Sequence, residues 1–127
     1  MIKYWFDLCD DNLKSAKVLF KGKRYLDAGF FCHQIAEKAL KAVISYNTAE
    51  IPPYIHKLKR LSDIGNITDQ LSEEQINLLI ELDPLNIEAR YPDYKASISK
   101  TMTAAKTKEI INKTEEFLCW IKQRLNY

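Results

Sequence analysis

The side chains best suited to hold an anion lie in one short stretch, IEARYPDYKA, at residues 87–96. It places Arg90 beside Tyr91, Pro92 and Asp93. Proline removes a backbone donor and disfavours helical geometry at the residue before it, so we expect the chain to turn here. A guanidinium held by a rigid turn suits a carboxylate or a phosphate. An Arg that pairs with an acidic side chain and fixes the turn explains the pattern equally well.

Two lysines could extend such an anion site. Lys38 and Lys41 are three positions apart, so a helix would place them on one face. Ammonium groups hold phosphate through charge-assisted hydrogen bonds. A solvated helix face accounts for either lysine equally well. Together with Arg90, Tyr91 and Asp93, they form the predicted ligand-binding set.

The two histidines are the candidates for acid–base chemistry. His33 borders the apolar face of a predicted helix and joins the ligand-binding set, although a partly buried, hydrogen-bonded histidine is the commoner role there. His56 follows the Pro52–Pro53 loop, and we expect it to cap or anchor the helix after it. The chain has no His-x-x-x-His pair and no glycine-rich nucleotide loop. We therefore expect no metal, no cofactor and no catalytic residue of a standard type.

The cysteines and the hydropathy pattern indicate a compartment. The chain has three cysteines, Cys9, Cys32 and Cys119. Their number is odd and they lack metal-ligand spacing, so we predict three buried thiols in a reducing cytoplasm. No apolar run reaches the roughly 18 residues of a membrane span. The N-terminus lacks the pattern of a secretory signal. We expect a cytoplasmic protein with no membrane contact.

These groups must be positioned by helices. The 127 residues are 46% hydrophobic and 28% charged, which is typical of one globular domain spanning 1–127. Strand-like alternation is weak throughout, so we predict an all-α fold, an up-and-down bundle of four to five helices. Three long helices are predicted, over residues 2–21, 24–46 and 97–125. A short helix is predicted between His56 and Gly65, and another begins at Ser72, with a kink or restart at Asp83–Pro84.

The helix predicted over 24–46 is apolar around most of its circumference. Such a helix is either central in a bundle or buries a second face against another subunit, and on the second alternative we predict a homodimer. Only a narrow polar stripe interrupts it, consisting of Asp27, Gln34, Lys38, Lys41 and Ser45.

Three blocks of the chain resemble the HEPN family, a nucleotide-binding domain of higher eukaryotes and prokaryotes. The first is YLDAGFFCHQIAEKALKAVI, with its Glu-Lys-x-Leu-Lys-Ala run at 37–42. The others are IHKLKRL, with His56 and Leu58, and IEARYPDY, with Arg90, Tyr91 and Pro92. The blocks occur in the family's order and cover nearly the whole chain.

The resemblance implies a helical bundle that often dimerises, in a small prokaryotic protein often encoded beside a minimal nucleotidyltransferase. Some relatives are ribonuclease toxins, in which four to six residues separate an Arg from the His that follows it. This chain has no such pair, because no histidine follows His56 and none follows Arg24 at that spacing.

Three functions are therefore weighed. The first is a non-catalytic or weakly active nucleotide- or RNA-binding module, the partner of a nucleotidyltransferase in a toxin–antitoxin-like pair. The second is a metal-independent ribonuclease with a non-standard set such as Arg90, Tyr94, Lys95 and His33. The third is a purely structural dimerisation module.

Overall fold

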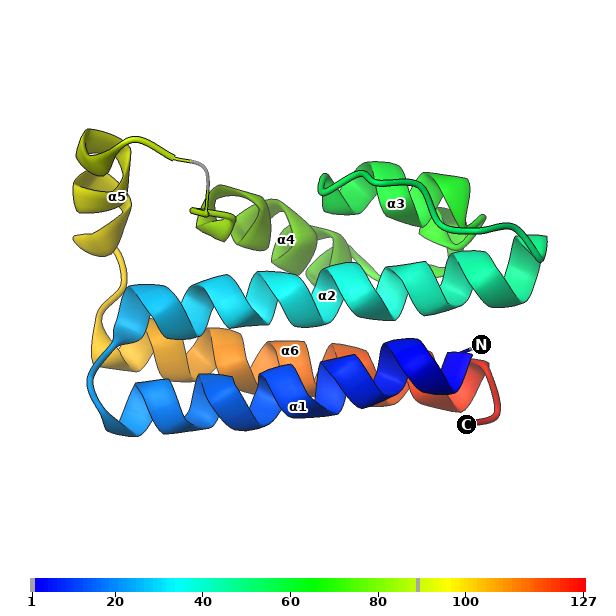
Figure 1. Cartoon of the computed structure of the whole chain (residues 1–127), viewed down its shortest axis with the longest axis horizontal. Coiled ribbons are helices and arrows are strands. Elements are labelled where there is room, and N and C mark those ends of the chain that lie inside the picture. Colours follow the sequence, from blue (N-terminus) through cyan, green and yellow to red (C-terminus); the bar gives the residue numbers. More distant parts are fainter. Residues whose placement is uncertain (1, 89) are drawn as a thin grey trace.

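Three long helices form the body of the molecule (Figure 1). The computed structural model describes residues 2–88 and 90–127. Helices α1 (Ile2–Lys21), α2 (Tyr25–Thr48) and α6 (Ala104–Arg124) run side by side along its long axis. The shorter elements are α3 (Leu58–Ile64), α4 (Glu73–Leu82) and α5 (Pro92–Ser99), with 3-10 turns at Thr68–Gln70 and Asp83–Leu85. The described residues include no strand, and the predicted all-α class is confirmed.

The long helices and α4 alternate in direction. Figure 1 shows α1 and α4 running opposite to α2 and α6, which is an up-and-down arrangement. Helix α5 stands apart at the end of the bundle where α1 meets α2. The described residues thus form six α-helices, and four of these helices correspond to the predicted bundle.

Helix α2 is central, because its apolar circumference is covered within the same chain. It packs against α1, α6, α3 and α4. Its interior positions are buried from Ala28 to Ile44, and they belong to one continuous hydrophobic core. Of the two alternatives predicted for this helix, a central place in the bundle is therefore the one observed. A homodimer remains a prediction, since α2 no longer requires one.

The long final helix predicted over 97–125 is wrong. The chain forms two helices in this region, and the first of them, α5, already begins at Pro92, whose missing N–H costs nothing at the first helical position. Helix α5 ends at Ser99, and α6 begins after Thr103, whose side chain accepts a hydrogen bond from the Lys106 N–H at 3.1 Å. A threonine N-cap of this kind stabilises a new helix start.

Two further observations qualify the predictions. Cys9 and Cys32 are buried, but Cys119 is exposed, because it lies on the face of α6 opposite the buried Leu118 and Ile121. Among the helices that the structure describes, none has the length and apolar character needed to cross a membrane.

Candidate functional site

A groove opens along the middle of α2 and holds most of the predicted anion-binding side chains. We call it the cationic groove. Its walls come from the first turns of α1, the loop after α2 and the segment that follows α4, and its volume is about 710 Å³. The residues that line it are Trp5, Gln34, Glu37, Lys38, Lys41, Tyr54, His56, Asn86, Glu88 and Arg90.

A buried carboxylate forms the floor of the cationic groove. Glu37 is only 2% exposed. Its Oε2 accepts a hydrogen bond from Lys41 Nζ at 3.1 Å, and its Oε1 accepts one from His56 Nδ1 at 3.0 Å. Burial would raise the pKa of Glu37, but Lys41, the His56 hydrogen bond and the charge of Lys38 together hold it below its usual value. Glu37 is therefore ionised at neutral pH.

Lys41 is committed to this buried cluster and is not free for a ligand. Its ammonium group pairs with Glu37 and lies 5.9 Å from the centre of the Trp5 ring and 5.8 Å from that of Tyr54. An ammonium between two aromatic faces gains cation–π attraction. The prediction that Lys41 lies on a polar helix face is wrong, because only 6% of this residue is exposed.

The two histidines are linked through the loop after α2. His33 has no exposed surface, and its Nε2 donates a hydrogen bond to the main-chain oxygen of His56 at 3.1 Å. Burial lowers the pKa of His33, which keeps it neutral at pH 7. His33 lies under the groove, so we no longer count it among the groups that could touch a ligand. The commoner role, a buried and hydrogen-bonded histidine, is the one observed.

His56 does not cap α3 with its side chain. The imidazole points to Glu37 instead, and the helix start is satisfied by Asp83, whose Oδ1 accepts from the Leu58 N–H at 3.1 Å. Asp83 lies at the predicted kink or restart before Pro84, and its carboxylate serves the start of a helix 25 positions earlier in the chain. His56 thereby becomes a side wall of the groove, with its side chain 41% exposed.

Arg90 provides a cation at the rim of the cationic groove. Its Nε donates to the Asn86 main-chain oxygen at 3.3 Å, and its guanidinium carbon lies 4.8 Å from the centre of the Tyr94 ring. The Tyr94 hydroxyl donates to the Pro84 oxygen at 3.0 Å, which fixes that ring. Among the residues described, no carboxylate forms a salt bridge with Arg90. The alternative in which Arg90 pairs with an acidic side chain is not observed.

The other predicted residues divide between groove and surface. Lys38 lines the groove, and its Nζ donates to Gln34 Oε1 at 2.8 Å and lies 3.8 Å from Glu37 Oε2. Tyr91 and Asp93 are exposed at the start of α5 and line none of the hollows described. The structure therefore brings together Lys38, Lys41 and Arg90.

Sequence reasoning missed the parts of the site that depend on tertiary contacts. Trp5 and Tyr54 had no role assigned, and His56 was given a different one. Only the Glu37–Lys41 pair had a local signal, since an acid four positions before a base is favourable in a helix.

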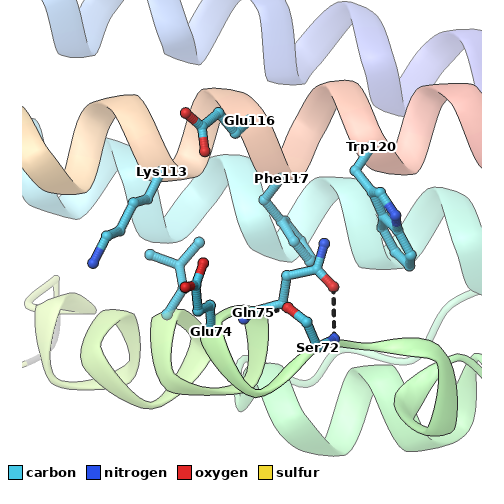
Figure 2. A pocket seen from close by; sticks show the side chains of 8 residues that line it. Ser72, Glu74, Gln75, Lys113, Glu116, Phe117 and Trp120 are labelled. Carbon is cyan, nitrogen blue, oxygen red and sulfur yellow. Dashed lines mark hydrogen bonds between the residues drawn. The ribbon is translucent and has the colours of Figure 1, made fainter.

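A second hollow lies between α4 and α6 (Figure 2). The side chains of Glu74, Glu116, Lys113 and Trp120 face it. Its two exposed carboxylates would repel a phosphate, and Lys113 pairs with Glu109 at 2.8 Å. The Ser72 and Gln75 groups at its edge bond each other in a capping box, at 2.9 and 3.1 Å. This hollow is therefore a poor candidate for an anion site.

No metal site is evident in the described part of the chain, where no group of three or more His, Cys, Asp or Glu side chains could hold an ion. That the protein needs no metal remains a prediction.

The Glu37–Lys41 pair predicts a large stability effect. Glu37→Gln should lower the free energy of unfolding by roughly 3–5 kcal/mol, because it leaves the Lys41 ammonium buried without its counter-charge. Adding Lys41→Met should restore much of the loss. Urea unfolding measures each variant, and Asp7→Asn, which breaks an exposed pair with Lys3, should change little. A Glu37→Gln variant as stable as the parent would contradict the assignment.

The same carboxylate predicts acid sensitivity. The pKa of Glu37 is lower in the folded protein than the 4.5 of the free group, so its ionisation stabilises the fold above pH 4.5. This contribution is lost as the pH falls through the folded value. The double variant Glu37→Gln/Lys41→Met should therefore lose less stability than the parent between neutral pH and pH below 4.5. Equal losses in the two proteins would argue against it.

Comparison with known proteins gives a family. No curated protein and no solved structure matches the chain. The HEPN domain family matches residues 2–125, which is nearly the full length. The chain, with its buried Glu37 cluster and its cationic groove, belongs to the HEPN domain family.

Proposed function

We propose that the cationic groove binds the phosphate of a nucleotide or of RNA, and that the protein is a non-catalytic or weakly active binding module. The observation that carries this proposal is the Arg90 guanidinium, which is exposed, held in place by Tyr94, and free of any carboxylate partner among the described residues. Because Nε donates to the Asn86 oxygen, the edge formed by the two Nη groups is the one left for bidentate contacts to phosphate oxygens.

Other side chains of the groove support the same ligand class. Lys38 adds a second cation to the lining of the cationic groove. Tyr54 is 89% exposed, and an exposed ring can stack on a nucleobase. The charge of Lys41 is balanced by Glu37, and Glu88 adds an acidic group at the rim. The groove therefore suits one or two phosphates better than a long polyanion. Membership in the HEPN domain family agrees with a nucleotide- or RNA-related role.

The ribonuclease alternative has lost support. Its non-standard set of Arg90, Tyr94, Lys95 and His33 needs an accessible acid–base group. His33 is completely buried, and the Tyr94 hydroxyl is bonded to the main chain. No observation favours that set over simple binding.

A protein partner is part of the proposal. We propose that the chain works with a minimal nucleotidyltransferase in a toxin–antitoxin-like pair, and as a homodimer. What supports a protein contact is a pair of exposed apolar side chains, Tyr4 and Ile51, that line a hollow between the start of α1 and the end of α2. Tagged protein purified from its own cells should retain a nucleotidyltransferase, and light scattering should give twice 14.8 kDa. A monomer recovered alone would count against both.

Arg90→Ala should weaken nucleotide or RNA binding about tenfold to a hundredfold without unfolding the protein, because a charge-assisted hydrogen bond contributes about 1.5–3 kcal/mol. Lys38→Ala should weaken it in the same direction. Binding is measured by fluorescence titration at two salt concentrations, beside thermal melting of each preparation.

The matched control is Arg124→Ala. Arg124 also stacks on an aromatic ring, 5.0 Å from the centre of Trp120, but it lines none of the hollows described. Its removal should leave binding unchanged. If the Arg90 and Arg124 variants lost affinity equally, the loss would be explained by net charge alone. A parent protein that binds no nucleotide or RNA at low salt would refute the proposal.

A further inference from the structure

One nitrogen of His56 is held by a buried carboxylate, and the other is free. His56 Nδ1 lies 3.0 Å from Glu37 Oε1, so Nδ1 carries the ring proton and donates a hydrogen bond to the carboxylate. In the neutral ring the lone pair is then on Nε2. The two nitrogens of an imidazole point in widely different directions, and in the described part of the chain Nε2 has no hydrogen-bond partner. The side chain is 41% exposed and lines both the cationic groove and a neighbouring hollow, which is also lined by Asp83, Pro84 and Tyr94.

The ring is also fixed in orientation. Tyr54 packs edge-on against it, with the ring centres 4.8 Å apart, and the His56 main-chain oxygen is tied to His33 at 3.1 Å. A carboxylate that fixes the tautomer and a neighbour that fixes the plane leave a nucleophilic nitrogen directed away from Glu37. Arg90 and Lys38 line the same groove as His56.

We propose that His56 Nε2 is a phosphoryl acceptor, so that the groove forms a phosphohistidine. The proposal rests on the anion-binding function proposed above, because Arg90 and Lys38 would hold the oxygens of the transferred group. It assigns to the site a covalent step that simple binding lacks. The donor class is a phosphoric anhydride such as a nucleoside triphosphate.

The step balances with the groups present. The Nε2 lone pair attacks the terminal phosphorus, an N–P bond forms, and the P–O bond to the leaving group breaks. Its electron pair departs with the nucleoside diphosphate oxygen. No proton has to leave the ring, because Nε2 is unprotonated at the start. The phosphorylated ring keeps its proton on Nδ1 and carries a positive charge, and its Nδ1–H still donates a hydrogen bond to the Glu37 carboxylate.

The chain contains an internal control. It has two histidines, and His33 is fully buried with its Nε2 already bonded. Phosphorylation should therefore occur at His56 alone in the folded protein and at both histidines in the unfolded chain.

The test uses phosphoramidate, a small donor whose P–N bond breaks to release ammonia. The native protein is incubated with it at neutral pH, and the acid-labile adduct is located by mass spectrometry under alkaline conditions. His56 should react at least about tenfold faster in the native protein than in urea, because the groove positions the donor beside the nitrogen. A native rate equal to or below the unfolded rate, or reaction at His33 instead, would overturn the proposal.

Three variants separate activation from mere exposure. Arg90→Ala should slow the reaction about tenfold while His56 stays equally accessible. Glu37→Gln, tested only if its circular dichroism matches that of the parent, should also slow it. Arg124→Ala should react like the parent. Unchanged rates in Arg90→Ala would show that the groove does not assist the transfer and would overturn the assignment.

A parallel measurement keeps this inference apart from the proposed function. Binding of a non-hydrolysable nucleoside triphosphate is titrated on the same preparations. Binding without any phosphohistidine from phosphoramidate or from a nucleoside triphosphate would refute the covalent step and leave the binding function standing. Phosphohistidine formation without nucleotide binding would support the acceptor and refute the nucleotide as ligand.

Discussion

The buried Glu37 carboxylate is the group on which the site depends. It lies on the central helix, and burial of a charge is costly unless it is paired and hydrogen-bonded. Lys41 and His56 both satisfy it, at 3.1 and 3.0 Å. One bond is local to α2, and the other fastens the loop after α2 to that helix. The carboxylate therefore sets the position of His56, the burial of Lys41 and the shape of the cationic groove.

The central place of α2 explains why its polar residues are arranged in this way. Helices α1, α3, α4 and α6 cover it, so a polar side chain on α2 needs a partner unless it reaches the groove. Glu37 and Lys41 pair with each other, and His33 bonds the His56 main chain. Lys38 lines the groove from a half-buried position, and its Nζ donates to Gln34 Oε1. The same packing that builds the core thus selects which charges remain for a ligand.

The segment before α5, which is distant from α2 in the sequence, completes the groove. Pro92 starts α5, and this start leaves Arg90 in the segment that faces α2 and the loop after it. Tyr94 supports the guanidinium and is itself bonded to the Pro84 oxygen. An aromatic support and a guanidinium without a carboxylate partner among the described residues together favour recognition of an anion over a purely structural pin. The family match over residues 2–125 agrees with this emphasis on binding.

The amino-acid sequence by itself determined the all-α class, the HEPN family blocks, the helix ends at Gly22 and Ser72, and the break at Tyr91–Pro92. These follow from periodicity, capping and proline geometry, which act over a few neighbouring residues. Only the tertiary structure decided that His33 is buried, that His56 turns to Glu37 rather than capping α3, and that Asp83 caps α3 instead. It also divided the last predicted helix at Thr103. The hydrogen bonds of His56 to Glu37 and of Leu58 to Asp83 join residues 19 and 25 positions apart. Such pairs form only when the helices pack, because a buried polar group must bond to a partner that lies near it in the folded chain.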